Sequence, residues 1–186
     1  MCRRLPRPLG RAPVGVNAKR RHMPAPDQSP PYSFRPAHEH DAPGAAACVN
    51  AAYRHYVGRI GRPPGPMTED YAKVIRERRV TVAESRGKIT GVLVLAVTEE
   101  GFLLENVAVD PSHHGKGLGR TLIEFAETEA RREGFESIYL YTHEKMTENR
   151  ALYAKIGYVE FDRRTEKGLT RIYMRKSLNA DLPPRD

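Results

Sequence analysis

Three closely spaced glycines mark the part of the sequence best suited to binding chemistry. Gly115, Gly117 and Gly119 lie between an apolar segment, residues 101–109, and a segment with helical periodicity. The first N–H groups of a helix have no intrahelical partner, and the helix dipole adds partial positive charge there. Glycines, which lack Cβ atoms, let a ligand approach those groups closely. The turn therefore predicts a binding site for an anion such as a pyrophosphate.

The spacing of these glycines argues against two common phosphate-binding motifs. Gly-Lys-Gly-Leu-Gly is not the Gly-x-Gly-x-x-Gly of dinucleotide-binding folds, and the chain contains no Gly-x-x-x-x-Gly-Lys-Ser/Thr. A dinucleotide-binding unit would also alternate strands and helices from its start, whereas three consecutive strands, at 80–84, 89–98 and 101–109, are predicted here before the turn. A glycine-rich turn without a ligand is the alternative interpretation.

Apolar periodicity places the turn between a strand and a helix. Residues 101–109 are rich in branched and aliphatic side chains, as expected of a strand covered on both faces. After the turn, a helix with one buried stripe is predicted to begin near Gly117 and to end at Gly134. A right-handed crossover then places the strand predicted at 137–143 parallel to 103–109. The residues of the buried stripe are Leu118, Leu122, Ala126 and Ala130.

The remaining segments predict smaller elements on both sides of this unit. Their boundaries follow from Gly and Pro breaks and from capping residues. In chain order they are a strand at 32–35, a helix from Asp41 to Tyr56, a Gly/Pro-rich loop at 58–66, a helix capped by residues 68–70, a short helix capped by Thr147 and ended by Gly157, and a hairpin of residues 159–164 and 169–178.

Positive charge is concentrated at the N-terminus. The 186-residue chain has a formal net charge of +8, but residues 1–22 hold seven basic residues and no acidic one. From Met23 onward, 24 basic residues face 23 acidic ones, so the domain predicted at 32–178 is nearly neutral and is not expected to bind nucleic acid. Residues 1–31 are expected to be a disordered basic tail, with Met23 as an alternative natural start, and 179–186 a polar tail. No apolar run reaches the roughly 18 residues that a membrane span needs.

The cysteines and histidines predict neither disulfides nor a metal site. Cys2 and Cys48 give no disulfide framework and no zinc spacing, which favours a reducing cytoplasm. Residues 113–114 and 38–40 contain histidines but no helical i, i+4 pair or nearby third ligand, which favours exposed loop histidines. No metal cofactor is expected.

The glycine turn resembles the acetyl-CoA signature of the GNAT family of N-acetyltransferases. Val107 and Val109 match its Val-x-Val, Gly117 and Gly119 match its glycines, and His114 stands where the family usually has Gln or Arg. The resemblance covers residues 32–178. It implies an α/β fold with a mixed, mostly antiparallel central sheet, flanked by helices, in which two parallel strands splay apart to admit acetyl-CoA. A second family signature is matched by Asn149, Tyr153, Lys155, Gly157 and Tyr158.

The resemblance implies a cofactor site and a general acid. Backbone N–H groups of Val107 and Val109 would bind pantetheine, and the Tyr153 hydroxyl would lie near the thioester sulfur and protonate it. Asn149, four residues earlier on the same helix face, would hold pantetheine or bind the base through water. The full set expected to contact acetyl-CoA is Val107, Ala108, Val109, His114, Gly115, Lys116, Gly117, Leu118, Gly119, Arg120, Asn149 and Tyr153.

Acetyl transfer to an amine would also require a base, because a lysine-like amine has a pKa of about 10.4. Glu105 is the first candidate because it interrupts an otherwise apolar strand, although a carboxylate there can instead pair with a basic side chain. His143 is the second candidate and is also expected in the substrate pocket. The resemblance adds four further pocket residues, Tyr53, Tyr56, Arg59 and Tyr71.

The expected function is therefore N-acetylation of a primary amine, with acetyl-CoA as co-substrate. A small-molecule acceptor is favoured because no added recognition domain is evident. The alternatives are a protein N-acetyltransferase and a non-catalytic acyl-CoA-binding sensor or interaction module, with which His114 is compatible. A homodimeric partner is included in the expectation because dimers are common in similar proteins.

Overall fold

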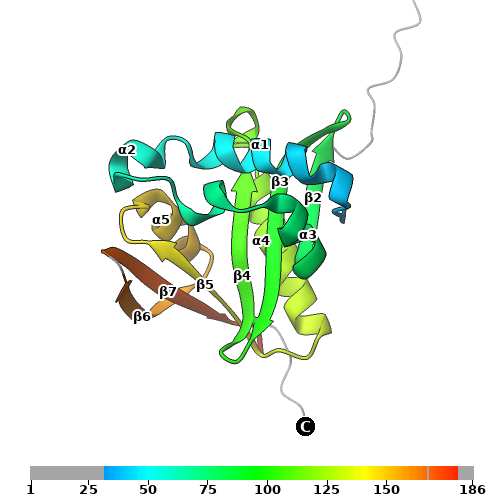
Figure 1. Cartoon of the computed structure of the whole chain (residues 1–186). Coiled ribbons are helices and arrows are strands. Elements are labelled where there is room, and N and C mark those ends of the chain that lie inside the picture. Colours follow the sequence, from blue (N-terminus) through cyan, green and yellow to red (C-terminus); the bar gives the residue numbers. More distant parts are fainter. Residues whose placement is uncertain (1–31, 167, 180–186) are drawn as a thin grey trace, which may run out of the picture.

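The computed structural model describes residues 32–166 and 168–179 (Figure 1). The predicted tail at 1–31 and residues 180–186 lie outside this part of the chain. Within it, no helix is long and apolar enough to cross a membrane.

The described residues form one seven-stranded sheet with the strand order β1-β2-β3-β4-β5-β7-β6. Strands β4 and β5 are parallel, and all other neighbours are antiparallel. This is the mixed, mostly antiparallel sheet that the family resemblance implies. The strands are β1 (Ser33–Pro36), β2 (Arg79–Ser85), β3 (Lys88–Thr98), β4 (Gly101–Val109), β5 (Ser137–His143), β6 (Val159–Glu166) and β7 (Leu169–Ser177).

Helices cover both faces of the sheet, which gives three layers (Figure 1). One face carries α1 (Ala42–Tyr53) and α3 (Tyr71–Glu77), and the other carries α4 (Leu118–Arg132). The short α2 (Tyr56–Ile60) contacts α5 (Thr147–Lys155), and both lie on the side of the molecule that carries β5, β6 and β7. Short 3-10 turns occupy Glu39–Asp41, Gly65–Thr68 and Pro111–His113.

Two predicted helix boundaries are wrong. The first helix ends at Tyr53, and Tyr56 begins a separate short helix. Thr147 is the first residue of α5, and Met146 occupies the cap position.

Asp41 precedes α1 as predicted, but its carboxylate does not cap that helix. The carboxylate instead accepts two hydrogen bonds from Arg35, at 2.7 and 2.9 Å, and one from the His38 N–H. The buried Asp41 carboxylate therefore ties β1 to the start of α1, and the pairing with Arg35 holds its pKa well below the usual value.

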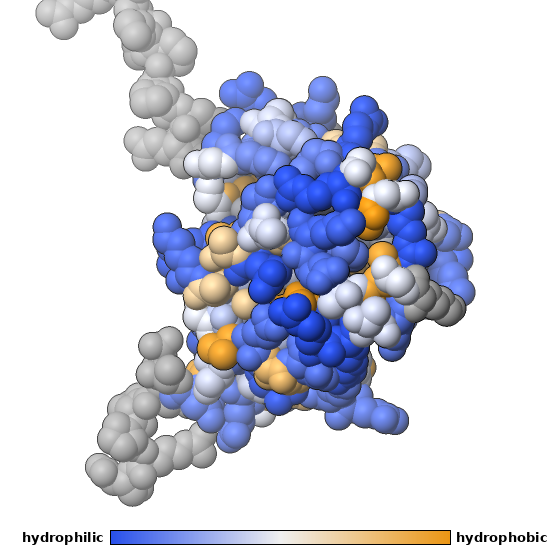
Figure 2. All heavy atoms as spheres, turned by 90° about the vertical axis from the view of Figure 1, so that its left-hand side faces the viewer, coloured by the Kyte–Doolittle hydropathy of each residue, from blue (hydrophilic) through white to orange (hydrophobic). Residues whose placement is uncertain are grey.

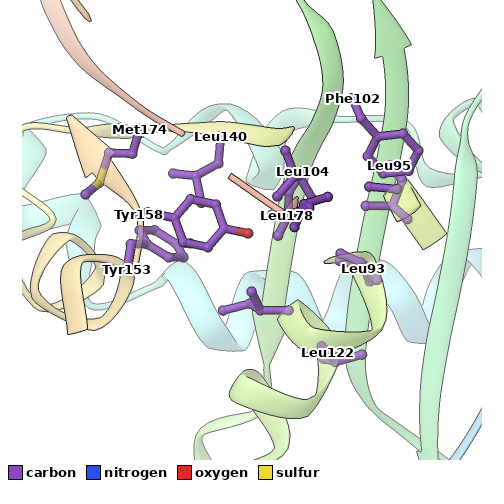
Figure 3. Packing of buried hydrophobic residues seen from close by; sticks show 14 of the residues in the cluster. Leu93, Leu95, Phe102, Leu104, Leu122, Leu140, Tyr153, Tyr158, Met174 and Leu178 are labelled. Atoms are coloured by element: carbon purple, nitrogen blue, oxygen red, sulfur yellow. The ribbon is translucent and has the colours of Figure 1, made fainter. Parts of the chain in front are cut away.

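The main core lies between the sheet and α4. All four residues of the predicted stripe are buried there, together with leucines from β3, β4 and β5. Tyr153 and Tyr158 extend this core next to Leu140 and Met174 (Figure 3). Cys48 is buried as expected in a second cluster, which packs α1 and α3 on the opposite face.

Glu127 is buried on α4, although the sequence pattern places it on a polar face. Its Oε2 accepts a 2.7 Å hydrogen bond from Lys176 of β7. Its Oε1 and the neighbouring Tyr158 hydroxyl have no hydrogen-bond partner within the described residues. The buried ion pair joins α4 to the C-terminal strand.

Strand β4 contains a β-bulge at Glu105. Leu104 and Asn106 pair with consecutive residues of β3, which leaves Glu105 as the extra residue. Side chains in a regular strand alternate between the two faces, and a bulge shifts that alternation by one position. Leu104 and Val107 accordingly pack on the α4 side, whereas Asn106 contacts residues of α1 and α3.

The surface beside α2, α5 and β6 is mainly hydrophilic, with hydrophobic residues in small separate groups (Figure 2). Leu152, Val159 and Phe161 are exposed large hydrophobic residues on α5 and β6. The Arg175 guanidinium lies 4.3 Å from the centre of the Phe161 ring.

Candidate active site

The two parallel strands separate after a short paired stretch. Phe102, Leu103 and Leu104 pair with residues 138–140, but β4 continues to Val109 and β5 continues to His143. Figure 1 shows the two strands diverging from this paired end, as the splayed-strand expectation requires. Beyond the pairing, the facing backbone edges have lost their ladder partners and can bind a ligand.

A cavity of about 340 Å³ lies at this split. Its lining includes Leu104, Val107 and Tyr153, which belong to the α4 side of the sheet. It also includes Tyr53 and Tyr71 from the α1 side. Because residues of both faces line one cavity, the cavity passes between the diverging strands.

Asn106 organises the wall on the α1 side and was not among the predicted site residues. It is buried, its Oδ1 accepts a 2.7 Å hydrogen bond from Tyr53, and its Nδ2 donates to the Tyr71 hydroxyl at 3.2 Å. The Tyr71 hydroxyl in turn donates to the carbonyl of Pro66. Two predicted pocket tyrosines are thus held by one side chain. A polar residue in an apolar strand, next to Glu105, is the signal that could have identified it.

Tyr153 is buried in the core and lines the cavity. Its hydroxyl makes no hydrogen bond with another described residue. Burial raises the pKa of its phenol, so the group stays protonated across the physiological pH range. The hydroxyl is available as a proton or hydrogen-bond donor to a ligand in the split.

Glu105 lines the same cavity and is partly exposed. Its Oε2 accepts a 3.0 Å hydrogen bond from Arg78, so the ion pair considered from the sequence is present. The pairing leaves its other carboxylate oxygen free of bonds to described residues. Glu105 can therefore still accept a proton from a bound amine.

His143 lines the cavity at the end of β5. Its Nδ1 accepts a hydrogen bond from the Lys145 N–H at 3.1 Å, so the proton of the neutral ring lies on Nε2. Desolvation is the main cause that lowers the pKa of His143, with help from Arg62 and Lys145. A neutral ring whose Nδ1 is already bonded and whose Nε2 carries the proton has no free acceptor nitrogen, which favours Glu105 over His143 as a base.

The glycine turn has the backbone geometry predicted for an anion site. Gly117 caps α4 with φ +83° and Gly115 has φ +73°, a left-handed conformation that glycine adopts without strain. The fifteen-residue α4 follows directly, so its first N–H groups lie at this turn. A Cβ at Gly119 would lie 3.6 Å from the Val109 side chain, so the helix start packs closely on the end of β4.

The side chains of the turn are engaged elsewhere. His114 Nε2 donates to the Val109 carbonyl at 2.9 Å, and Lys116 donates to the Ser112 carbonyl. Arg120 pairs with a glutamate on α4, and the side chains of Leu118 and Ala108 are buried. The turn therefore offers its backbone to a ligand, and His114 has a structural role in tying the turn to β4.

Tyr56 and Arg59, two predicted pocket residues, do not line the cavity. The Tyr56 hydroxyl donates to Asn149 Oδ1 at 3.2 Å, and Arg59 pairs with both oxygens of Glu148 at 2.7 and 2.9 Å. Both residues bridge α2 to α5 instead. Asn149 lines the cavity, and its carbonyl oxygen is bonded to Tyr56; its contact with acetyl-CoA stays a prediction.

Within residues 32–166 and 168–179, no three His, Cys, Asp or Glu side chains come together as metal ligands. The site instead combines a cavity between diverging parallel strands with a glycine-lined helix start. These features define the acyl-CoA N-acyltransferase class of folds.

The chain belongs to the acetyltransferase (GNAT) family, whose profile matches residues 45–158. It is 31% identical over 74 residues to the ribosomal protein bS18-alanine N-acetyltransferase of Escherichia coli, a match that covers 40% of this chain and 50% of that protein. The chain thus spans about half the length of the curated relatives that it matches.

Solved structures share the fold across nearly their whole length. A paia N-acetyltransferase of Thermoplasma acidophilum, in complex with coenzyme A, matches with a TM-score of 0.66 and 17% identity, covering 78% of this chain and 98% of that one. The Salmonella typhimurium protein yncA, with its cofactor acetyl-CoA, matches with a TM-score of 0.61 and 22% identity, covering 83% and 98%.

Proposed function

We propose that the protein is an N-acetyltransferase that moves the acetyl group of acetyl-CoA to a primary amine of a small molecule. The observation that carries the proposal is the cavity between β4 and β5. Tyr153, Glu105 and Val107, which belongs to the unpaired part of β4, all line it. Family membership and the coenzyme A complexes of the two related structures support acetyl-CoA as the co-substrate.

The residues of the cofactor site fit a pyrophosphate followed by a narrow chain. The N–H groups at the start of α4 would bind the pyrophosphate, and the freed backbone groups of residues 107–109 would bind pantetheine. The bound co-substrate supplies an activated acyl group. Asn149 would contact the chain from the α5 side.

The cavity residues have separate tasks in the transfer. Glu105 would accept a proton from the amine, since its carboxylate lies at the cavity and retains one oxygen without a described partner. The protonated Tyr153 would donate to the sulfur as the carbon–sulfur bond breaks and the carbon–nitrogen bond forms. Positioning the two reactants can lower the barrier by about 7–11 kcal/mol. A single acid or base such as Tyr153 or Glu105 raises the rate by roughly 10²–10⁴-fold, which is a smaller effect.

A protein N-acetyltransferase is the second candidate. The name of the E. coli relative favours it, because that protein is described as acting on an alanine of a ribosomal protein. A non-catalytic acyl-CoA sensor is the third.

Cytoplasmic location belongs to the same proposal and is supported by the free, buried Cys48 thiol. A homodimer stays a prediction.

The direct test is release of free thiol from acetyl-CoA by the full chain, with a panel of amino acids, polyamines, aminoglycosides and a peptide with a free N-terminus and a lysine. We expect turnover with at least one small amine. Turnover of the peptide alone would establish the protein acetyltransferase. Acetyl-CoA binding by calorimetry without turnover of any amine would refute the enzyme and favour the sensor.

A further inference from the structure

The charged residues that line the cavity are divided unevenly between its walls. Carboxylates come only from β4 and from the segment around α3, as Glu105, Glu69 and Glu77. The described residues of β5 and β7 contribute His143 and Arg171 as basic groups, next to the phenol of Tyr141. Lys73 and Arg78 also line the wall formed by β4 and the segment around α3, and Arg78 pairs with Glu105, so that wall holds both acids and bases. The described lining residues of β5 and β7 include no acid.

Arg171 is held beside the cavity with most of its donors free. In the register of β5 and β7 it lies directly opposite His143. Its guanidinium carbon lies 4.9 Å from the centre of the Tyr141 ring, a cation–π contact. Its nearest carboxylate oxygen, from Glu166, is 3.7 Å away, beyond hydrogen-bond distance, and both side chains of this pair are exposed.

Arg62 adds a second guanidinium to this wall. It follows α2, lines the cavity, and has no hydrogen bond or ion pair with another described residue. The positive charge of Arg62 helps to lower the pKa of His143. Two arginines and the Nε2–H of a neutral histidine therefore line the cavity, and no described lining residue of β5 or β7 is an acid. The acids beside them, Glu166 near Arg171 and Glu144 near His143, lie outside the cavity lining.

We infer that the acceptor is an amino carboxylic acid, whose carboxylate binds Arg62, His143 and Arg171 while its amine lies toward Glu105. This inference rests on the proposed function and narrows its acceptor class. Arginine forks match carboxylate geometry, and a charge-assisted hydrogen bond is about twice as strong as a neutral one. A polyamine would place a second cation against two guanidinium groups, and a lysine side chain within a protein carries no carboxylate beside its amine.

The test compares a series of L-amino acids with their own α-amides and decarboxylated amines in the thiol-release assay. Amide and acid are nearly equal in size, so their ratio of kcat/KM isolates the carboxylate. We expect the acid to be preferred by at least about tenfold, mainly through KM, as a lost charged hydrogen bond predicts. Arg171→Gln and Arg62→Gln should each lower this acid-to-amide ratio of kcat/KM by about tenfold. Arg132→Gln, an exposed arginine on α4, should leave it unchanged.

The outcomes separate the inference from the function on which it rests. Equal or better use of amides and decarboxylated amines would overturn the inference and leave the acetyltransferase standing. Unchanged acid-to-amide ratios in both arginine variants would also overturn it. If no amine is acetylated at all, the proposed function falls, and the inference falls with it.

Discussion

Replacing Tyr153 with phenylalanine would test the proposed acid with little disturbance of the fold. The hydroxyl bonds to no other described residue, so we expect the free energy of unfolding to change by less than about 1 kcal/mol. The effect on turnover follows from the raised pKa of the phenol. A thiol has a pKa of about 8.5 and an unperturbed phenol one of about 10, so complete proton transfer to a thiolate is uphill by at least about 2 kcal/mol.

Tyr153 should therefore act mainly as a hydrogen-bond donor to charge developing on the sulfur. Such a bond contributes about 1.5–3 kcal/mol, so kcat should fall by about 10- to 150-fold at saturating acetyl-CoA. Initial rates of thiol release at saturating acetyl-CoA measure this fall in kcat. Tyr158→Phe is the matched control, because that ring lies 5.9 Å from the Tyr153 ring in the same core and has no place in the cavity lining. A kcat within twofold of the wild type, or an equal loss in the control, would refute the role.

Three further predictions concern the base, the turn and the fold. Glu105→Gln should lower kcat by about 10²–10⁴-fold, whereas Arg78→Gln should have a much smaller effect in the same assay; the reverse order would remove Glu105 as the base. Gly117→Ala and Gly134→Ala place an alanine at φ +83° and +82° at opposite ends of α4, so each should cost about 1–2 kcal/mol in urea unfolding. Only the former should weaken acetyl-CoA binding in calorimetry, and equal affinities would exclude the turn as the pyrophosphate site. Asp41→Asn should destabilise the fold by about 1–3 kcal/mol at pH 7. Because folding lowers the pKa of Asp41, this stabilisation is present above the unfolded value and should shrink as the pH falls below about 4; a pH-independent difference in thermal unfolding would contradict the pairing.

The elements around the glycine turn could be predicted from the sequence because their signals are local. The strand at 101–109 and the strand at 137–143 have the bounds that apolar runs and Gly/Pro breaks predicted. The buried stripe of α4 followed from its four-residue spacing. Two glycines with positive φ, Gly115 and Gly117, account for the turn. Backbone preference and periodicity act within a few residues, so one sequence is enough to read them.

The cavity wall could not be predicted in the same way, because it depends on contacts between distant segments. Tyr56 and Arg59 were expected at the substrate, but they meet α5, about 90 residues further along the chain. The hydrogen bonds of Asn106 to Tyr53 and Tyr71 depend on the bulge at Glu105. No glycine or other turn-forming residue at that position indicates the bulge in the sequence. Side-chain partners of this kind are fixed by the assembled sheet.

The bulge also makes β4 respond differently to a deletion than to a substitution. A substitution of Glu105 changes one side chain and leaves the order of inward and outward positions intact. Deletion of the same residue would restore regular alternation along β4, so that residues on one flank of the gap would have to exchange faces. Either the valines beside the glycine turn or the leucines of the core would then lose their packing. Natural variation in length at this position should therefore be much rarer than variation in residue type.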